Sequence, residues 1–489
     1  MKKMILKVKN KKRFVTVLSI AIILIVLILL AQNKNTLMHK VLHKILNMGE
    51  EEGITVTYAD TTRQKFNFNY DWIFSKGEGK NNASSNLREE EILVIPNDSN
   101  VLPYQSTYSI SENNIGRNNE LWEEVSLPHT YNDVDTFDTF TETGYNGDRS
   151  TYSGTAWYKK EFYIPLEYQG KEIYIEFEAA RQAAKVYLNG TLLEGTYENG
   201  FIPFGYNLTQ YINYGANNTI TVMVDNSYPY YMEGTRDKVS WHDSHWHPNY
   251  GGLYRNSYLY VIDPLHLTLP LYSFMQTEGT YIYTSNETST TADINIEAQV
   301  ENNYNTDKTV KLVSYVKNMN GTALLEISSS NTTLTAGEKK TIAISDTLTN
   351  AIRWSTNYPY LYTVECKLIL EENNTETVID NNSTQIGIRT FRFTNDNGFF
   401  LNENYEKLQG WGQKPTNEWA GLGAAYPDWM QDSVIKLMKE AGSNFIRWGH
   451  CSGSPTQVSA ADKYGLITMQ PRSGWRRRNS KWCLYIKYI

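Results

Sequence analysis

The stretch Leu408–Gln470 constrains the fold most, because there the spacing of hydrophobic residues changes from every second residue to about every 3.6 residues. Much of the chain before it alternates with the period of β-strands. Within the stretch, apolar runs at 408–412, 444–448 and 466–469 are separated by two segments with helical spacing. Because parallel strands need a long crossover, the order strand, helix, strand, helix, strand predicts a parallel sheet.

Residue types at the ends of the two expected helices support these limits. Asp428, with Gln431 three residues later, is expected to cap the first helix, and Gly442 ends it. Ser454-Pro455-Thr456-Gln457 has the pattern of a capping box with proline at the first helical position, and Gly465 ends the second helix. The apolar face of the first helix is expected to consist of Met430, Val434, Leu437, Met438 and Ala441.

Polar and aromatic residues follow the first two strands of this sheet. The chain reads Trp411-Gly412-Gln413-Lys414 at one strand end and Arg447-Trp448-Gly449-His450 at the next. In parallel α/β folds, functional groups gather where the carboxyl ends of strands meet their loops. Aromatic rings beside hydrogen-bonding groups suit a sugar, which has apolar C–H faces and a polar rim. The residue types equally allow a structural interpretation, in which the tryptophans fill a core layer and Arg447 pairs with a carboxylate.

The chain upstream of this sheet predicts β-sandwiches. Residues 173–178 alternate apolar and polar side chains, which predicts a strand with one buried and one solvated face. Asn189-Gly190 suits a tight hairpin turn, since both central residues need positive φ. Further alternating runs at 220–224 and 294–300 are separated by turn residues. Cys366 shares a strand face with its apolar neighbours two residues away, so we expect a small core residue.

Trp241–Pro248 is the densest cluster of polar and aromatic residues in the chain. It contains three histidines within six residues. Three histidines so close together invite a metal site, but no carboxylate or cysteine ligand lies at a recognised spacing from them. We therefore expect neither a metal nor a cofactor.

Several motifs, in order along the chain, resemble glycoside hydrolase family 2, the β-galactosidase-like enzymes. They are Phe66–Phe74, Leu127–Thr130, Trp354–Tyr362, Gly387–Phe393 and Gly398–Asn402. The resemblance runs from about Phe66 to Pro471. It implies a mainly β fold with a jelly-roll-like sugar-binding sandwich and an immunoglobulin-like sandwich, followed by the first part of a (β/α)8 barrel.

Domain limits follow from the resemblance and from shifts in composition. The expected segments are a membrane anchor or signal segment at 1–31, a linker at 32–59, the sugar-binding domain at 60–264, the immunoglobulin-like sandwich at 265–390, the barrel part at 391–471 and a basic tail at 472–489.

The resemblance also implies which residues bind substrate. Arg447 and His450 match positions after the second barrel strand where the family binds its sugar, and Trp411 matches the end of the first. Arg447 is expected to anchor a hydroxyl or the nucleophile's carboxylate. His450 is expected to hydrogen-bond the sugar, with a purely structural histidine as the alternative. Asp243 lies in the segment before the family motif Gly252-Leu253-Tyr254-Arg255, where a loop lines the sugar pocket in the family, and a structural contact between domains is the alternative.

Family members are retaining glycosidases with two glutamates whose carboxyl groups lie about 5 Å apart. The resemblance places both at the ends of later barrel strands. Asn402-Glu403 and Asn417-Glu418 are Asn-Glu pairs, but their neighbours do not match the family's acid/base site. We therefore expect no catalytic residue in this chain and a barrel cut off by a frameshift or a premature stop before the tail Arg472–Ile489. A basic tail made for a partner is the alternative.

The amino end predicts export. Phe14–Ala31 is an uncharged, mostly aliphatic run that follows a lysine-rich segment ending at Arg13. We expect an uncleaved membrane anchor with extracytoplasmic domains, and cleaved secretion is the alternative. The three cysteines imply no disulfide framework. The net charge of −7 argues against a nucleic-acid partner, although solubility alone explains it equally well.

Together these patterns predict a membrane-anchored, β-galactosidase-like hydrolase of O-glycosyl bonds whose substrate is a β-galactoside or a related glycan. We expect negligible turnover from the 489 residues alone, because both catalytic carboxylates are expected to be missing. The rival hypothesis is a membrane-anchored surface protein that binds carbohydrate without catalysis. A third hypothesis is a fragment that a second chain completes with the rest of the barrel.

Overall fold

The computed structural model describes several segments of the chain, all within the unit Val56–Ile489. They are residues 63–79, 123–131, 154–197, 199–226, 250–270, 275–413, 422–449 and 452–470. The expected anchor, linker and basic tail lie outside these segments, as do Asp243, His450 and the cluster Trp241–Pro248. Within the described segments, no helix has the length and apolar character needed to cross a membrane.

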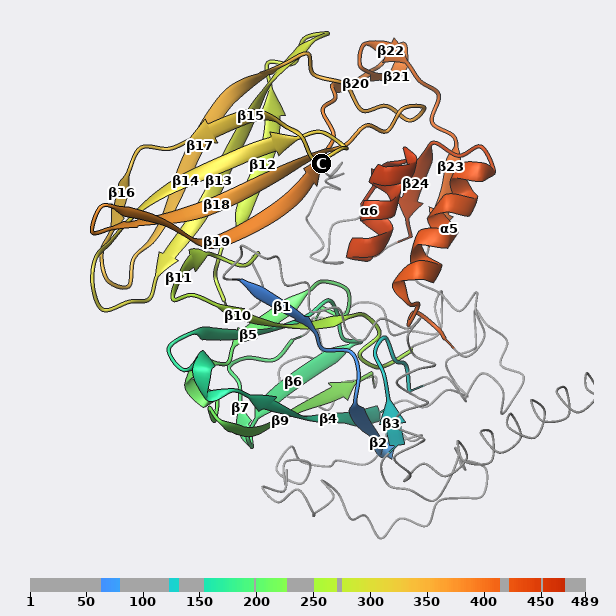
Figure 1. The fold of residues 1–489 in the computed structure, drawn as a ribbon. Coiled ribbons are helices and arrows are strands. Elements are labelled where there is room, and N and C mark those ends of the chain that lie inside the picture. Colours follow the sequence, from blue (N-terminus) through green and yellow to red (C-terminus); the bar gives the residue numbers. More distant parts are fainter. Residues whose placement is uncertain are drawn as a thin grey trace, which may run out of the picture. The chain divides into compact units, whose positions relative to one another are not determined.

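Two antiparallel sheets form the first sandwich (Figure 1). One sheet has the order β1 (Gln64–Asn67), β10 (Ser257–Ile262), β5 (Glu172–Phe177), β8 (Phe204–Asn207). The other has the order β3 (Glu123–Val125), β2 (Trp72–Gly79), β4 (Gly154–Ile164), β9 (Ala216–Asp225), β6 (Ala183–Leu188), β7 (Thr191–Leu192). Trp72, Phe177 and Val222 belong to the apolar core that both sheets build. The predicted Asn189-Gly190 turn joins β6 and β7 with φ values of 50° and 81°, which confirms it.

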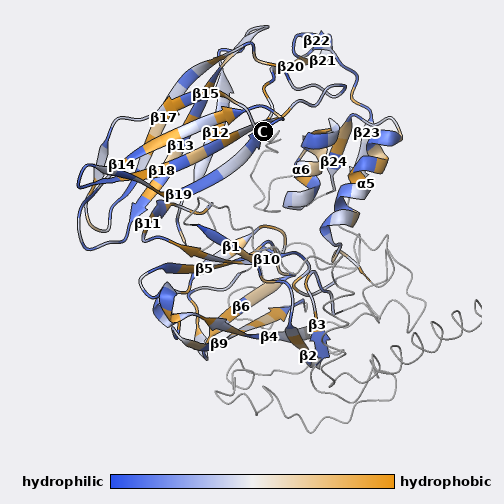
Figure 2. Cartoon of the chain, viewed as in Figure 1, coloured by the Kyte–Doolittle hydropathy of each residue, from blue (hydrophilic) through white to orange (hydrophobic). Residues whose placement is uncertain are grey.

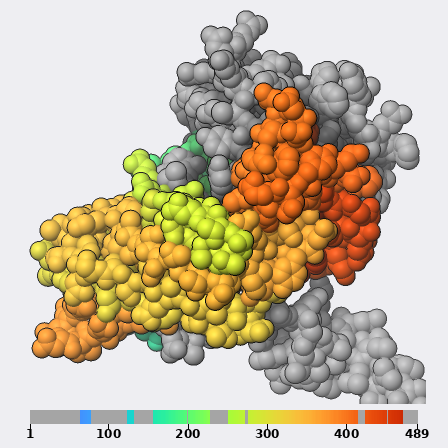
Figure 3. Space-filling view, turned by 90° about the horizontal axis from the view of Figure 1, so that it is seen from above, coloured from blue at the N-terminus to red at the C-terminus, as the bar shows by residue number. Residues whose placement is uncertain are grey.

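The second sandwich also consists of two antiparallel sheets. One contains β11 (Leu265–Leu267), β13 (Thr291–Asn302), β12 (Thr280–Ser285) and β17 (Lys339–Thr349). The other contains β15 (Ala323–Ser328), β14 (Lys308–Lys317), β16 (Thr332–Leu334), β18 (Tyr362–Glu372) and β19 (Thr375–Ile386). Hydrophobic and hydrophilic residues alternate along these strands, as the sequence predicts (Figure 2). Cys366 is fully buried in this core, as expected. Figure 3 shows the sandwich, in yellow and light orange, with much of its surface open on the face in view.

Strand β5 departs from the prediction, because both of its faces are buried. Ile173 and Ile175 pack into the core of the first sandwich. Tyr174 and Glu176, which were expected on a solvated face, are only 5% and 7% exposed. A second apolar cluster that includes Leu269 covers Tyr174. Alternation shows only that the two faces of a strand differ, and here residues distant in sequence keep water from the polar face.

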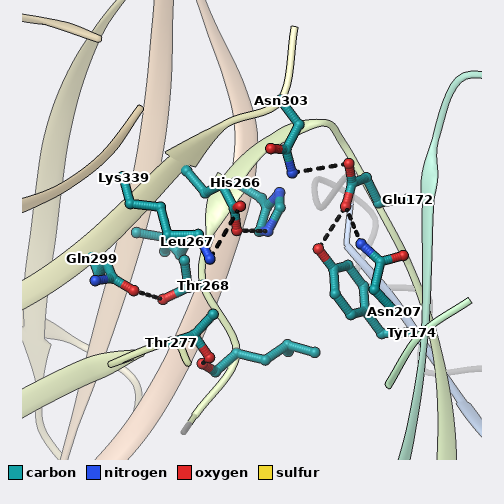
Figure 4. A network of polar contacts seen from close by, with 12 residues as sticks. Glu172, Tyr174, Asn207, His266, Leu267, Thr268, Thr277, Gln299, Asn303 and Lys339 are labelled. Carbon is teal, nitrogen blue, oxygen red and sulfur yellow. Dashed lines mark hydrogen bonds and ion pairs between the residues drawn. The ribbon is translucent and has the colours of Figure 1, made fainter. Parts of the chain in front are cut away.

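The covered face of β5 carries polar contacts that reach the second sandwich (Figure 4). The Glu172 carboxylate accepts hydrogen bonds from the Tyr174 hydroxyl at 2.5 Å and from the Asn207 amide at 3.1 Å. It also accepts one from the Asn303 amide, which follows β13, at 2.9 Å. Because three donors satisfy the carboxylate, its burial is compatible with a stable fold.

A buried ion pair strengthens the same junction. Arg63 Nε, just before β1, donates to Asp380 Oδ1 of β19 at 2.8 Å, and Arg63 Nη2 pairs with the other carboxylate oxygen. The backbone N–H of Leu267 also donates to Asp380, at 2.8 Å. The side chains of Arg63 and Asp380 are 12% and 1% exposed. The first strand of one sandwich is thereby tied to the last long strand of the other.

A small ribbon follows the second sandwich along the chain. It consists of β20 (Phe391–Thr394), β21 (Gly398–Leu401) and β22 (Asn404–Tyr405). Asn402 and Glu403 form the turn between β21 and β22, with φ values of 50° and 65°. Arg392 Nε donates to the Glu403 carboxylate at 3.2 Å. This Asn-Glu pair is therefore part of a tight turn.

The last described part is a parallel sheet of β23 (Gly410–Gln413), β24 (Phe445–Trp448) and β25 (Ile467–Met469). Helix α5 (Asp428–Glu440) follows β23, and helix α6 (Pro455–Tyr464) follows β24. The predicted order and direction of these elements are confirmed. The capping box at Ser454 is present, and Gly465 ends α6 with a φ of 78°. Gly442, after α5, has a φ of 87°, as expected.

Helix α5 corrects two predictions. Its N-cap is Pro427 and no side chain caps it, because the Asp428 carboxylate accepts hydrogen bonds from Asn256 and Thr456 instead. Met430 is buried and Met438 packs partly against the core, as expected, but Gln431 and Ile435 are buried as well and Leu437 is 60% exposed. Gln431 can be buried because its Nε2 donates to the Tyr426 carbonyl at 2.6 Å.

Candidate carbohydrate site at the parallel sheet

The two faces of the parallel sheet have different surroundings. Ile446 and Trp448 of β24 pack against Ile435 of α5 and Val458 of α6, so the helices cover this face. Successive residues of a strand point to opposite faces. Arg447, between Ile446 and Trp448, therefore lies on the face that the helices leave uncovered.

Arg447 is exposed and has room beside it. Its register partner in β23 is Gly412, and a Cβ added at Gly412 would meet no atom within 4 Å. Among the described residues, Arg447 forms no hydrogen bond or ion pair. An arginine with its guanidinium uncommitted can donate up to five hydrogen bonds to hydroxyl or carboxylate oxygens. The face beside Arg447 can therefore accept an oxygen-rich ligand.

The sheet does not bring Trp411 to the same face as Arg447. Trp411 pairs in register with Ile446, so its ring lies on the side of the helices, at the edge strand, where it is 53% exposed. Two further predicted contacts, His450 and Asp243, lie outside the described residues. The grouping of these residues into one sugar site stays a prediction.

Residues of the first sandwich contact the segments that follow the strands of this sheet. Arg255 Nη2 donates to the Ser452 carbonyl, before α6, at 3.0 Å, and Arg255 Nη1 holds the Phe201 carbonyl at 2.9 Å. Asn256 Nδ2 donates to the Asp428 carboxylate at 3.0 Å. These hydrogen bonds fix the starts of both helices against the sandwich.

Apolar packing supports the same contact. Ala179 and Tyr254 of the sandwich cluster with Ala424 and Ala425, before α5. Gly423 has a φ of 53°, and a Cβ there would lie 2.6 Å from the Tyr250 ring. Only glycine allows the chain to pass so close to that ring. Residues 423–425, before α5, are thereby held against the sandwich.

Sequence reasoning missed the roles of Arg255, Asn256 and Glu178. The motif Gly252-Leu253-Tyr254-Arg255 was visible, but it pointed only to the loop before it. Glu178 was expected on a solvated strand face, yet it is 6% exposed. Burial raises the pKa of its carboxyl to about 7; nearby Arg255 opposes the shift, while Asp428 and Glu176 add to it. No group of three or more metal-ligating side chains occurs among the described residues.

Two β-sandwiches followed by a parallel sheet with helices on one face define a multidomain, mainly β protein with an α/β segment. The profile of glycosyl hydrolases family 2, sugar binding domain, matches residues 120–263, and that of glycosyl hydrolases family 2 matches residues 277–389. The chain belongs to glycoside hydrolase family 2, as its motifs predict.

Individual relatives support this assignment. A β-glucuronidase of Formosa agariphila is 41% identical over 417 residues, which cover 85% of this chain and 39% of that protein. A β-galactosidase of Thermoanaerobacter pseudethanolicus is 29% identical over 357 residues, covering 73% of this chain and 43% of that protein. The chain thus spans about two fifths of the length of these relatives.

Solved structures agree with the fold. The structure of a β-glucuronidase from glycoside hydrolase family 2 superposes with a TM-score of 0.69 at 40% identity, over 84% of this chain and 39% of that one. Bacteroides uniformis β-glucuronidase 2, covalently bound to cyclophellitol-6-carboxylate aziridine, gives a TM-score of 0.66 at 26% identity, over 83% of this chain and 42% of that one.

Proposed function

We propose that the protein is a retaining β-glycosidase that removes β-linked glucuronate or galactose from glycans. The two sandwiches are then its sugar-binding and immunoglobulin-like domains, and the parallel sheet is the first part of its (β/α)8 barrel. The higher identity to a β-glucuronidase, 41% against 29% for a β-galactosidase, supports glucuronides as the first choice of substrate.

The observation that carries the proposal is the position of Arg447. It lies near the carboxyl end of a parallel strand, on the face without helices, and none of the described residues binds its guanidinium. In a closed barrel, the face without helices becomes the interior, and substrates bind at the carboxyl ends of the strands. Arg447 would then hold a substrate oxygen, with His450 three residues further on as a second hydrogen-bonding group.

The described strands of the sheet supply no acid/base and no nucleophile. The residues that share the face of Arg447 are Gly410, Gly412, Phe445, Ile467 and Met469. None of them is a carboxylate. We therefore propose that the described strands contribute substrate binding, and that the two carboxyl groups about 5 Å apart that retaining hydrolysis needs lie outside these strands.

Calorimetric titration of the purified chain with phenyl β-thioglucuronide and phenyl β-thiogalactoside tests the proposal, because neither probe is readily hydrolysed. Arg447→Ala should weaken binding at least tenfold, the order expected for a lost hydrogen bond to a charged group. Arg392→Ala, which removes an exposed arginine from the ribbon, is the matched control and should bind like the wild type. Equal affinity of the wild type and Arg447→Ala would contradict the proposal.

A second candidate function is a carbohydrate-binding surface protein without catalysis, exported and held at a membrane by residues 1–31. The lack of a carboxylate beside Arg447 on the described strands favours it. It predicts that glycan binding survives Arg447→Ala, because the sandwiches alone bind the sugar. The same titration therefore separates the two candidates.

A further inference from the structure

A cleft lies where the two sandwiches meet helices α5 and α6, on the helix side of the parallel sheet. We call it the junction cleft; its volume is about 530 Å³, and its lining includes Glu178, Tyr258, Met319, Leu361, Ser459 and Lys463. A volume of this size is typical of small-molecule sites. Arg447 points to the other face of the sheet, so the cleft is separate from the site proposed above.

Glu178 is a buried carboxylate in the lining of the junction cleft. It is only 6% exposed although it lines the cleft, and among the described residues none donates a hydrogen bond to its carboxylate. The nearby Arg255 guanidinium is committed to the carbonyls of Phe201 and Ser452. The carboxylate lines the cleft and its oxygens are not sealed from it, so hydrogen-bond donors can reach them from the cleft. Burial raises the pKa of Glu178 to about 7.

The remaining lining combines hydroxyl groups with apolar surface. Ser459 is an exposed hydroxyl-bearing residue on α6. Met319, which is 69% exposed, and Leu361 supply apolar surface in the lining. A sugar offers hydroxyl donors for carboxylates and C–H faces for such apolar side chains.

The charges around the cleft disfavour a cation or an acidic sugar. Asp432, which also lines it, is already bound by Lys463 at 3.1 Å and by the Tyr464 hydroxyl at 2.6 Å. No cluster of three metal-ligating side chains occurs there among the described residues. A uronate would bring a further negative charge toward Glu178, which the carboxylate of Asp428 already influences.

We propose that the junction cleft binds a neutral oligosaccharide, with the Glu178 carboxylate accepting hydrogen bonds from its hydroxyl groups. The site would hold a glycan chain to the enzyme at a distance from the reacting sugar. It does not depend on Arg447 or on the reaction proposed above.

The test is saturation-transfer NMR and calorimetry on the 489-residue chain with lactose, cellobiose and xylotriose as neutral probes and a glucuronate-terminated disaccharide as the acidic probe. At least one neutral probe should bind saturably at millimolar concentration and more tightly than the acidic probe. Ser459→Trp, which fills the cleft from an exposed helix position, should abolish this binding. Glu178→Gln should weaken it about tenfold, as expected when a charged acceptor becomes neutral.

Matched controls keep the result interpretable. Lys436→Trp and Glu440→Gln change exposed residues of α5 outside the lining and should leave binding unchanged. Arg447→Ala should also leave it unchanged. The proposal is overturned if no neutral probe binds, if both cleft variants bind like the wild type, if the acidic probe binds more tightly, or if Arg447→Ala abolishes the neutral sugar's binding. Melting curves establish that each variant is folded, and Ser459→Trp and Glu178→Gln test the cleft independently.

Discussion

Strands β5 and β17 have the same alternating pattern but meet different surroundings. In β17, Ile342 and Ile344 face the core of the second sandwich, and Ala343 and Ser345, which alternate with them, are exposed. In β5, every residue is buried. The outer face of β17 is open to water, whereas the outer face of β5 is covered by residues from distant parts of the chain. Cover of this kind turns ordinary surface carboxylates into buried ones.

Two carboxylates on the covered side show the two outcomes of such burial. Glu172 receives hydrogen bonds from three side chains, so both of its oxygens have donors within the protein. Glu178 receives none from a side chain among the described residues, and its pKa rises. The residues around Glu172 therefore serve the structure, whereas Glu178 lines a cleft that a ligand can enter.

The largest difference in stability between the covered and the open regions is expected at the buried ion pair. Asp380→Ala should destabilise the protein by about 3–5 kcal/mol, because it leaves the Arg63 guanidinium buried without its partner. Urea unfolding measures the change. Glu376→Ala on the same strand removes an exposed partner of Lys311 and should have a far smaller effect. A similar loss in the free energy of unfolding for both variants would show that water reaches the residues that cover β5.

The raised pKa of Glu178 should make the free energy of unfolding depend on pH. Its folded pKa of about 7 lies above the ordinary value of 4.5, so the folded state holds a proton that the unfolded state has released. Its contribution to stability is present below pH 4.5 and is lost as pH rises to about 7. The loss is about 3 kcal/mol. Unfolding free energies of Glu178→Gln should lack this fall, while those of Glu440→Gln should keep it. A wild type whose stability is flat between these pH values would contradict the burial argument.

A glycine pair tests how tightly the cover is packed. Gly423→Ala should destabilise by about 1–3 kcal/mol, because its Cβ would approach the Tyr250 ring to 2.6 Å at a positive φ. Gly412→Ala has open space around the new Cβ and should change the free energy of unfolding by about 0.5 kcal/mol or less. Thermal melts of the two variants, measured side by side, decide whether the loop is held as closely as described.

The smallest effect is expected at Leu437. Because this side chain is 60% exposed on α5, Leu437→Gln should change stability by about 0.5 kcal/mol or less. Ile435→Ala, two residues earlier and fully buried, should cost about 2–5 kcal/mol. If chemical denaturation gave the reverse order, the buried stripe of α5 would follow the sequence prediction rather than the structure.

The sequence alone was sufficient for features that depend on neighbouring residues. The Asn189-Gly190 turn, the capping box at Ser454 and the helix ends at Gly442 and Gly465 all follow from local backbone preferences. The parallel direction of the last three strands follows too, because a helical crossover between strands permits little else. The motif that contains Arg447 placed it near a strand end, although its role in binding stays a prediction.

Only the tertiary structure decided which polar strand faces are buried. Nothing near Glu178 or Asp428 in the sequence shows that Arg255 and Asn256 lie beside them, because these contacts join residues far apart in the chain. The same holds for Arg63 and Asp380. Period and propensity describe how a segment folds locally, whereas burial depends on what other segments place upon it. For that reason the pattern predicted the strands, while the assembled sandwiches and helices created the junction cleft.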